Sequence, residues 1–394
     1  MRKVRLAWWA TVVLFLMHGL IVSTWVSRIP AIQTALQISN GILGLTLLSA
    51  AVGAVTTIPI TGWLITRYGS RKVALISSIG FCCGLVLPAV AFNPLTLSLA
   101  LFFVGAVAAA MDVSMNAHGV EVERELGVPT MSRFHGMFSL GGMIGAGIGG
   151  AVAARGVSPL PHFAVSGAIN LAALLFFARP TMLDTHETGA ATGHRLPLKK
   201  IPPVLLALSA IAFCILLSEG AMADWTAVYL KQVLGAGPGL AAQGYAVFSA
   251  AMACFRFLGD IITTRLGPLL TVRVGSLVAA AGLIWALSVF SPHWALPGFA
   301  AVGAGFSVII PLAFGSGGRV PSINPGTGIA TVTGIGYVGF IVGPPAIGFA
   351  SQLVTLRYAL GIVVACCLIS ALLAGSMRLL TSSSPAEQAP EIHV

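Results

Sequence analysis

Charged side chains are scarce in this sequence. Asp, Glu, Lys and Arg make up 8% of its 394 residues, and only 11 residues are Asp or Glu. A soluble globular protein carries about a quarter charged residues, so this chain has too few to cover a surface in water. Apolar residues make up 57% instead, with a mean hydropathy of +0.96. These proportions exclude a soluble globule and indicate an integral membrane protein.

Cysteine is also rare, and the familiar catalytic motifs are missing. The six cysteines lie inside apolar segments without Cys-x-x-Cys spacing, so we predict neither disulfides nor a metal site. The sequence has no phosphate-binding Gly-Lys-Ser/Thr loop, no Gly-x-Ser-x-Gly elbow and no His-Glu-x-x-His helix. We therefore expect no ATP-driven pumping, no enzymatic activity and no cofactor.

The net charge of +10 does not indicate a nucleic-acid-binding protein. The basic residues form no dense run with interleaved aromatics, and most lie between apolar segments. In a membrane protein, such positions indicate topology, because Lys and Arg near span ends favour the cytoplasm.

Long apolar segments dominate the sequence. Runs of about 18 or more residues predict twelve transmembrane helices. They begin near Ala7, Gly41, Lys72, Leu95, Phe134, Pro161, Pro202, Ala241, Leu269, Ala295, Gly326 and Leu356. An even number of spans places both termini on one side, and all Lys and Arg residues except Arg28, Arg155, Lys231 and Arg357 then lie on that side. This asymmetry predicts cytoplasmic termini.

One polar loop divides the predicted spans into two groups of six. We expect an N-terminal six-helix bundle over residues 1–179, a cytoplasmic loop over 180–200 and a C-terminal six-helix bundle over 201–380. Residues 381–394 contain Pro, Glu and Gln without apolar periodicity, so we predict a disordered tail. The predicted fold class is an all-α membrane protein.

The two halves resemble each other in sequence. Thr66-Arg67-Tyr68-Gly69 matches Thr264-Arg265-Leu266-Gly267, and the Gly141–Gly145 segment matches Gly339–Gly343, both at an offset of 198 positions. Trp25 and Trp225 stand 200 positions apart. Three matches at nearly one offset indicate an internal repeat, an arrangement common in transporters that rock about a central site.

The loop after the second span carries a family resemblance. Gly62, Arg67, Gly69, Arg71 and Lys72 approximate the pattern G-x-L-x-D-R-x-G-R-K of the major facilitator superfamily. Thr66 and Thr264 stand where that family has an acid. The resemblance covers almost the whole chain. It implies two six-helix bundles that rock about a midplane cavity, which is lined by the first, fourth, seventh and tenth helices.

A finer resemblance points to the fucose-permease-like branch of this family. It rests on the segments Trp25–Pro30, Asn116–Glu125, His135–Gly141, Glu219-Gly220, Asp224-Trp225 and Gly343–Pro345. The transported solutes of this branch are diverse, so the resemblance implies a mechanism more than a substrate.

Ionisable residues inside the predicted spans are candidates for proton coupling. Such residues cost about 2.5–3.5 kcal/mol to insert and usually face a cavity or a partner. Asp112 lies inside the fourth span, and Asn116 follows one helical turn later on the same face. Fucose permease has an acid and an asparagine at this spacing, so the resemblance implies that Asp112 binds the transported proton. Asp112 as a structural carboxylate paired with His18 is the alternative.

Two further groups complete the coupling hypothesis. Glu219 lies in the seventh span beside Gly220, where softened helical backbone can meet a substrate. His18 lies near the middle of the first span, and its unperturbed pKa of about 6.5 suits proton exchange. For both residues, structural packing remains the alternative.

The candidate substrate-binding residues are polar or aromatic. They are Asn116, Tyr337, Trp25, Trp225, Arg28 and Asp224. Aromatic rings can stack on a sugar, although tryptophans also gather at membrane interfaces. Asp224 and Arg28 can instead form a structural ion pair.

The candidate gating residues lie in the loops and in glycine-rich spans. They are Arg67, Gly69, Arg71, Arg265, Gly267, His135, Gly141, Gly145, Gly343 and Pro344. Gly141, Gly145 and Gly149 recur every four residues and predict a close helix–helix contact. The family resemblance implies that this contact lies where the two halves meet.

We predict a monomeric secondary active transporter in the bacterial inner membrane. Its expected partners are protons, membrane lipid and a small organic solute, with a sugar-like polar solute favoured. The alternatives are a proton-driven exporter of amphipathic compounds and a non-transporting membrane sensor.

Overall fold

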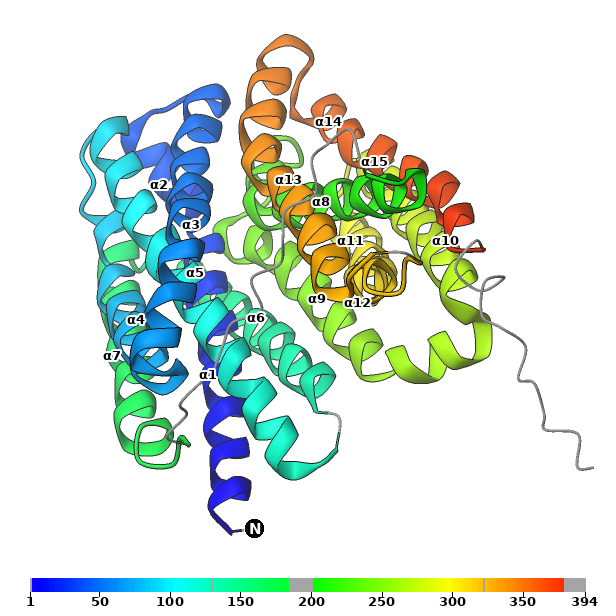
Figure 1. The fold of residues 1–394 in the computed structure, drawn as a ribbon. Coiled ribbons are helices and arrows are strands. Elements are labelled where there is room, and N and C mark those ends of the chain that lie inside the picture. Colours follow the sequence, from blue (N-terminus) through cyan, green and yellow to red (C-terminus); the bar gives the residue numbers. More distant parts are fainter. Residues whose placement is uncertain (1, 129, 184–200, 322, 379–394) are drawn as a thin grey trace, which may run out of the picture.

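The computed structural model describes residues 2–128, 130–183, 201–321 and 323–378, which form helices and no strand. The first group contains α1 (Arg2–Val26), α2 (Ile29–Leu36), α3 (Asn40–Tyr68), α4 (Ser70–Gly84), α5 (Pro94–Leu126), α6 (Met131–Ala154) and α7 (Pro159–Ala173). The second contains α8 (Pro203–Gln232), α9 (Pro238–Phe257), α10 (Gly259–Ser288), α11 (Pro292–Phe306), α12 (Ile309–Gly317), α13 (Pro325–Val354), α14 (Leu356–Ala359) and α15 (Gly361–Leu373). Figure 1 shows these groups, hereafter the N half and the C half, side by side. Most of the predicted loop 180–200 and the whole predicted tail lie outside the described residues.

Local sequence explains where these helices begin. Six of them start with proline (Pro94, Pro159, Pro203, Pro238, Pro292 and Pro325). Proline suits the first helical position because its missing N–H would have no partner there. The side chain of Asn93 accepts a hydrogen bond from the backbone N–H of Thr96, whose own side chain completes a capping box.

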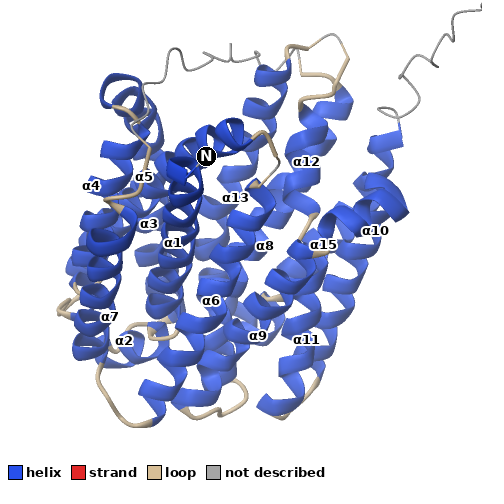
Figure 2. Ribbon diagram, turned by 90° about the horizontal axis from the view of Figure 1, so that it is seen from below, coloured by secondary structure: helices blue, strands red, loops and turns tan. Residues whose placement is uncertain are grey.

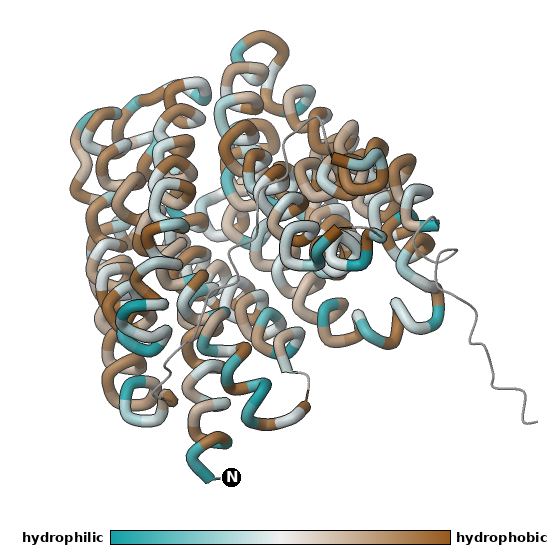
Figure 3. Tube along the Cα trace, in the orientation of Figure 1, coloured by the Kyte–Doolittle hydropathy of each residue, from teal (hydrophilic) through white to brown (hydrophobic). Residues whose placement is uncertain are grey.

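The described residues contain eleven helical segments that are long and apolar enough to cross a membrane. The segment predicted near Ala241 corresponds to α9, which has 20 residues and is not among the eleven. The membrane-spanning character of the chain is therefore confirmed, whereas the count of twelve remains a prediction. Most helices run alongside one another (Figure 2). Hydrophobic residues occupy much of their length (Figure 3).

The backbone repeats between the two halves. Gly69 (φ 82°, ψ 152°) and Gly267 (φ 73°, ψ 162°) share an unusual conformation at the predicted offset of 198. Gln37 and Gly235, also 198 positions apart, both have positive φ. The turn at Gly267 divides α10 into two segments. The first, residues 259–266, follows α9 almost directly, and the second contains the rest of α10. The internal repeat thus extends from sequence to backbone geometry.

The two halves pack along two helix pairs, α6 against α9 and α3 against α13. Glycines permit the close approach. A Cβ atom on Gly150 would lie 2.8 Å from the carbonyl oxygen of Gly239, and one on Gly44 would lie 2.6 Å from that of Pro344. Helix α6 also packs on α1, where Cβ atoms on Gly141 and Gly145 would overlap the backbone of Leu16 and the hydroxyl of Ser23. The predicted close contact at these glycines is therefore within the N half, while an adjacent face of α6 forms the joint between halves.

Candidate functional site

A first polar cluster joins α1 to α5. The Asn116 side-chain amide donates hydrogen bonds to the backbone carbonyl oxygen of Asp112 at 2.8 Å and to its carboxylate at 3.1 Å. His18 Nδ1 lies 3.9 Å from the same carboxylate. The side chain of Asp112 is 36% exposed, although it lies within a membrane span. Helix spacing thus joins the acid to the amide, and the packing of α1 against α5 adds the imidazole that the sequence singled out.

Packing fixes the imidazole of His18. Its ring meets those of Phe81 and Phe138 edge-on, each at 5.4 Å between centroids, and its side chain is 8% exposed. Nδ1 has no hydrogen-bond partner among the described residues. Asp112 is therefore the carboxylate towards which this nitrogen is held, at a distance too long for a direct hydrogen bond.

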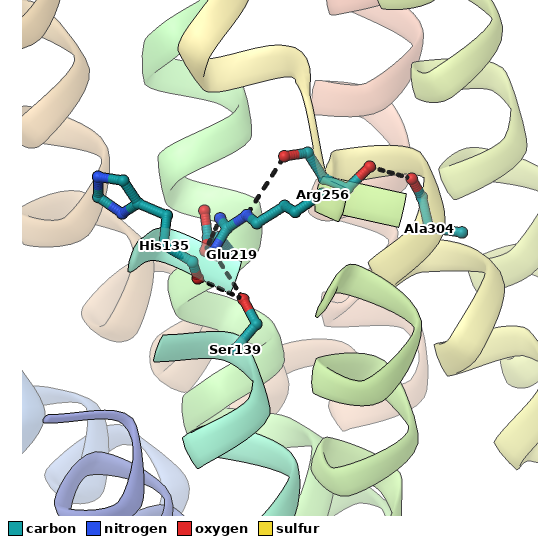
Figure 4. A network of polar contacts seen from close by, with 6 residues as sticks. His135, Ser139, Glu219, Arg256 and Ala304 are labelled. Atoms are coloured by element: carbon teal, nitrogen blue, oxygen red, sulfur yellow. Dashed lines mark hydrogen bonds and ion pairs between the residues drawn. The ribbon is translucent and has the colours of Figure 1, made fainter. Parts of the chain in front are cut away.

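A second polar cluster centres on Arg256 of α9 (Figure 4). Its guanidinium Nη2 lies 3.5 Å from the carboxylate of Glu219 on α8. Nη1 donates to the hydroxyl of Ser139 on α6 at 2.7 Å, and Nε donates to the carbonyl oxygen of Ser307 at 3.3 Å. Ser307 lies at the break between α11 and α12, where an interrupted helix leaves backbone carbonyls free to accept. One side chain thus contacts elements of both halves.

Sequence reasoning did not select Arg256 as a site residue. It was counted only as a basic residue near a span end, but Arg256 lies between Phe255 and Phe257 in an apolar segment. The rule that selected Asp112, that intramembrane charges have partners or functions, selects Arg256 equally well. The signal was therefore present in the sequence.

Tyr337 and His135 lie near both clusters. Tyr337 of α13 is within electrostatic range of Asp112 and Glu219. His135 of α6 is within electrostatic range of His18 and Arg256, and its ring lies edge-on to that of Phe15 at 5.2 Å between centroids. Tyr337 and His135 are partly exposed. The candidate site is thus a set of polar side chains from both halves.

Other predicted binding residues lie in packed surroundings. Trp225 is fully buried, and Trp25 is 9% exposed with its ring 6.5 Å from that of Phe163. Arg28 is 3% exposed and donates to the carbonyl oxygen of Val157 instead of to Asp224. In this conformation the structure does not bring Trp25, Trp225 or Arg28 to the two clusters.

The predicted gating residues have local contacts. Arg67 stacks over Trp63 and Tyr68, at 5.5 Å from each ring. Arg71 donates to the carbonyl oxygen of Arg179 at 3.0 Å, and Arg265 is exposed.

The gating residues of α13 lie against α8. A Cβ atom on Gly343 would lie 3.4 Å from Leu217 of that helix, and α13 continues through Pro344.

Four hydrogen bonds join the halves at the end where α2 meets α3. Lys231 donates to the carbonyl oxygen of Pro30 at 3.2 Å and to the hydroxyl of Thr34 at 2.7 Å. The Gln232 amide donates to Gln33 at 3.0 Å, and the Gln352 amide donates to Ser39 at 2.9 Å. We call these contacts the polar seal. They hold this end of the molecule closed between the halves.

The chain matches known proteins over most of its length. The family model for the Major Facilitator Superfamily matches residues 7–321. An uncharacterized MFS-type transporter of Yersinia pestis is 35% identical over 350 residues, covering 89% of this chain and 90% of that protein. The transporter y4wD of Sinorhizobium fredii is 33% identical over 368 residues, covering 92% and 96%. Membrane protein MosC of Rhizobium meliloti is 31% identical over 365 residues, covering 89% and 87%.

Solved structures share the fold. A bacterial homolog to the human lysosomal transporter Spinster, in an inward-facing and unoccupied conformation, has a TM-score of 0.77 and 16% identity, covering 98% of this chain and 99% of that chain. A mutant of the nucleoside transporter NupG has a TM-score of 0.72 and 14% identity, covering 95% and 99%. At these identities the likeness concerns the fold alone.

Proposed function

Because the chain belongs to the major facilitator superfamily, we propose that it is a secondary active transporter of a small organic solute. Transport is by alternating access and coupled to protons, and the favoured solute is polar and sugar-like. The observation that carries this proposal is the pair of polar clusters, His18–Asp112–Asn116 in the N half and Glu219–Arg256 in the C half, with Tyr337 near both carboxylates. A solute held between them contacts both halves at once.

Asp112 is the proposed proton-binding group. Its carboxylate has one amide donor and a distant imidazole, but no cation in direct contact among the described residues. A charged carboxylate in an apolar setting is costly, and protonation removes that cost. Binding a proton therefore changes the relative free energies of the conformations that expose Asp112 and those that bury it, which is the requirement for coupling.

Polar solutes fit the side chains of the site. Asn116 and Tyr337 offer hydrogen-bonding groups, and the Tyr337 ring lies 6.0 Å from that of Phe340, giving an aromatic surface beside polar atoms. Sugars combine hydroxyl groups with apolar ring faces, so this combination favours them over purely apolar compounds.

The experiment is a thermal-unfolding screen of the detergent-purified protein with sugars, nucleosides, carboxylates and amphipathic drugs. A bound ligand raises the unfolding temperature according to its concentration and affinity. Stabilisation by a sugar, followed by proton-driven uptake in proteoliposomes, is the expected result. Stabilisation by amphipathic drugs alone would replace the importer with the exporter of amphipathic compounds, and no stabilisation by any compound would favour the sensor.

The finer assignments are proposals of the same kind. We propose a place in the fucose-permease-like branch, with resemblance to the inner-membrane transporter YbjJ. We also propose a monomer in the bacterial inner membrane with both termini in the cytoplasm, and that α9 together with the first two turns of α10 forms the eighth of twelve spans.

A further inference from the structure

Arg256 is the side chain that links Glu219 to the other half of the molecule. Its three donating nitrogens reach three different elements, and the shortest of these hydrogen bonds, 2.7 Å to Ser139, crosses from the C half to the N half. Arg256 is 13% exposed and Glu219 is 21% exposed, so water only partly screens the pair. The orientation of the guanidinium is therefore set by this carboxylate together with the acceptors at Ser139 and Ser307.

The surface that this hydrogen bond crosses is lined by glycines of α6, and the Phe257 ring of α9 packs against Gly136 beside it. Gly142 faces Ser249 of α9, and Gly150 faces Gly239, where the two backbones approach each other closely. At these two positions the small residues let the backbones of the two helices approach each other with few side chains between them. The hydrogen bond from the charged Arg256 to Ser139 is directional, so it favours one relative position of α6 and α9.

Other ionisable groups surround this contact. His135 of α6 lies within electrostatic range of Arg256, Tyr245 of α9 within range of Glu219, Asp224 and Arg256, and Tyr337 of α13 within range of Glu219. Glu219 is the carboxylate paired with the guanidinium in the described residues. Protonation of Glu219 takes away the charge that holds Nη2 in place, and a solute hydroxyl that donates to the carboxylate competes with Nη2 for the same oxygen atoms.

We propose that Arg256 is a positioning residue that couples the charge of Glu219 to the joint between the halves. While Glu219 is charged, Arg256 is held so that Nη1 bonds Ser139, which favours the conformer described here with its polar seal closed. When Glu219 becomes neutral, Arg256 releases Ser139 and α6 can move along α9. This inference rests on the proposed function for the role of Glu219, but the link from Arg256 to Ser139 can be tested without knowing the solute.

The test is a double-mutant cycle read by the distance between two spin labels. Labels on Ala35→Cys and Gly237→Cys, both exposed positions beside the polar seal and in different halves, report whether that end is closed. The six native cysteines are first replaced by serine. We expect Ser139→Ala and Glu219→Gln each to lower the ratio of closed to open conformers about tenfold, as for loss of a charged hydrogen bond. The double variant should show no further decrease.

Matched controls separate coupling from general destabilisation. Ser218→Ala alters a serine beside Glu219 whose hydroxyl bonds Cys214 within its own helix, so the distance distribution should not change. Arg256→Lys keeps the charge but loses the fork that reaches Glu219 and Ser139 together, and should behave like Ser139→Ala. Each variant is also checked for an unchanged unfolding temperature.

The outcomes distinguish the inference from the proposed function. Additive effects of Ser139→Ala and Glu219→Gln, or a Ser139→Ala distribution identical to that of the parent, would overturn the coupling through Arg256. Neither result affects ligand stabilisation or proton-driven uptake, which test the proposed function. If Glu219→Gln leaves both the distances and proton-driven uptake unchanged, both proposals lose the role of Glu219.

Discussion

At the scale of single residues, the proposed mechanism depends mainly on the free-energy cost of charging one carboxyl group, that of Asp112. Asp112 receives one amide hydrogen bond from Asn116 and lies within a span, so its charge is only partly compensated. A group in this position favours one conformation when charged and another when neutral. A substitution that fixes the charge state of Asp112 should therefore affect proton-driven transport separately from solute binding.

We expect Asp112→Asn to abolish proton-driven accumulation of the solute found in the screen, because asparagine cannot carry a proton between the two sides. The loss should be at least about tenfold, while solute exchange without a gradient persists. Uptake into proteoliposomes with and without a pH gradient measures both. Glu125→Gln, an exposed carboxylate on the same helix, is the control and should leave uptake unchanged. Undiminished gradient-driven uptake by Asp112→Asn would exclude Asp112 as the coupling group.

Asn116 gives a second prediction, about binding. Asn116→Ala should remove most of the ligand-induced rise in unfolding temperature, since a lost hydrogen bond to a polar solute costs about 0.5–1.5 kcal/mol and the alanine also frees the carboxylate of Asp112. The control is Asn170→Ala, an asparagine of the same half whose amide bonds Ser166 within α7. An equal reduction in both variants would show that the effect is structural.

Sequence reasoning selected the acid and amide of the first cluster because helical spacing alone places residues i and i+4 together. It did not anticipate the burial of Trp225 or the contact of Arg28 with Val157, because these depend on how helices pack across the bundle. A tryptophan near a span end has the same sequence signature whether it faces lipid, solute or core. Tertiary packing makes that distinction, and no local pattern encodes it.

At the scale of helices, α6 has two different glycine faces. Gly141, Gly145 and Gly149 face α1, and Gly142 and Gly150 face α9. The recurrence every four residues predicts one close contact. Gly142 and Gly150 are offset from it by one position, and only the position of α9 in the structure shows that they form a second contact. Helix α6 thus packs closely on a helix of its own half and on a helix of the other half.

Gly141→Ala should lower the stability of the folded protein by about 1–3 kcal/mol, because the added methyl group meets the backbone of Leu16, which cannot rotate away. Gly147→Ala on the same helix has no atom within 4 Å of the new Cβ and should have no such effect. Thermal unfolding in detergent compares the two. Similar unfolding temperatures for both variants would contradict the packing described for α1 and α6.

At the scale of the whole molecule, the repeat organises both the fold and the site. The 198-residue offset, found in two short sequence matches, reappears in the backbone at Gly69 and Gly267. Sequence could predict this repeat because turns with positive φ favour glycine in both halves. The count of spans was less predictable, since the kink at Leu258 and the turn at Gly267 divide the eighth and ninth predicted spans differently from their apolar runs.

Orientation gives a prediction for the whole molecule. Reporter fusions that are active only in the cytoplasm should be active at both termini, because basic residues concentrate on that side. A fusion after Gly235, between α8 and α9, is the control and should be inactive, since this turn lies at the opposite end. Activity after Gly235 with inactivity at the termini would invert the proposed topology and place the polar seal inside.

The polar seal has a consequence for the medium in which the protein works. Lys231 bonds a carbonyl oxygen and a hydroxyl group, and the other two contacts join amides to an amide and a hydroxyl, so no bond of the seal joins opposite charges. Dissolved salt mainly weakens attractions between ions, whereas here the acceptors of the Lys231 ammonium group are uncharged and the other two hydrogen bonds join neutral groups. We therefore expect the balance between the closed and open seal to depend only weakly on ionic strength.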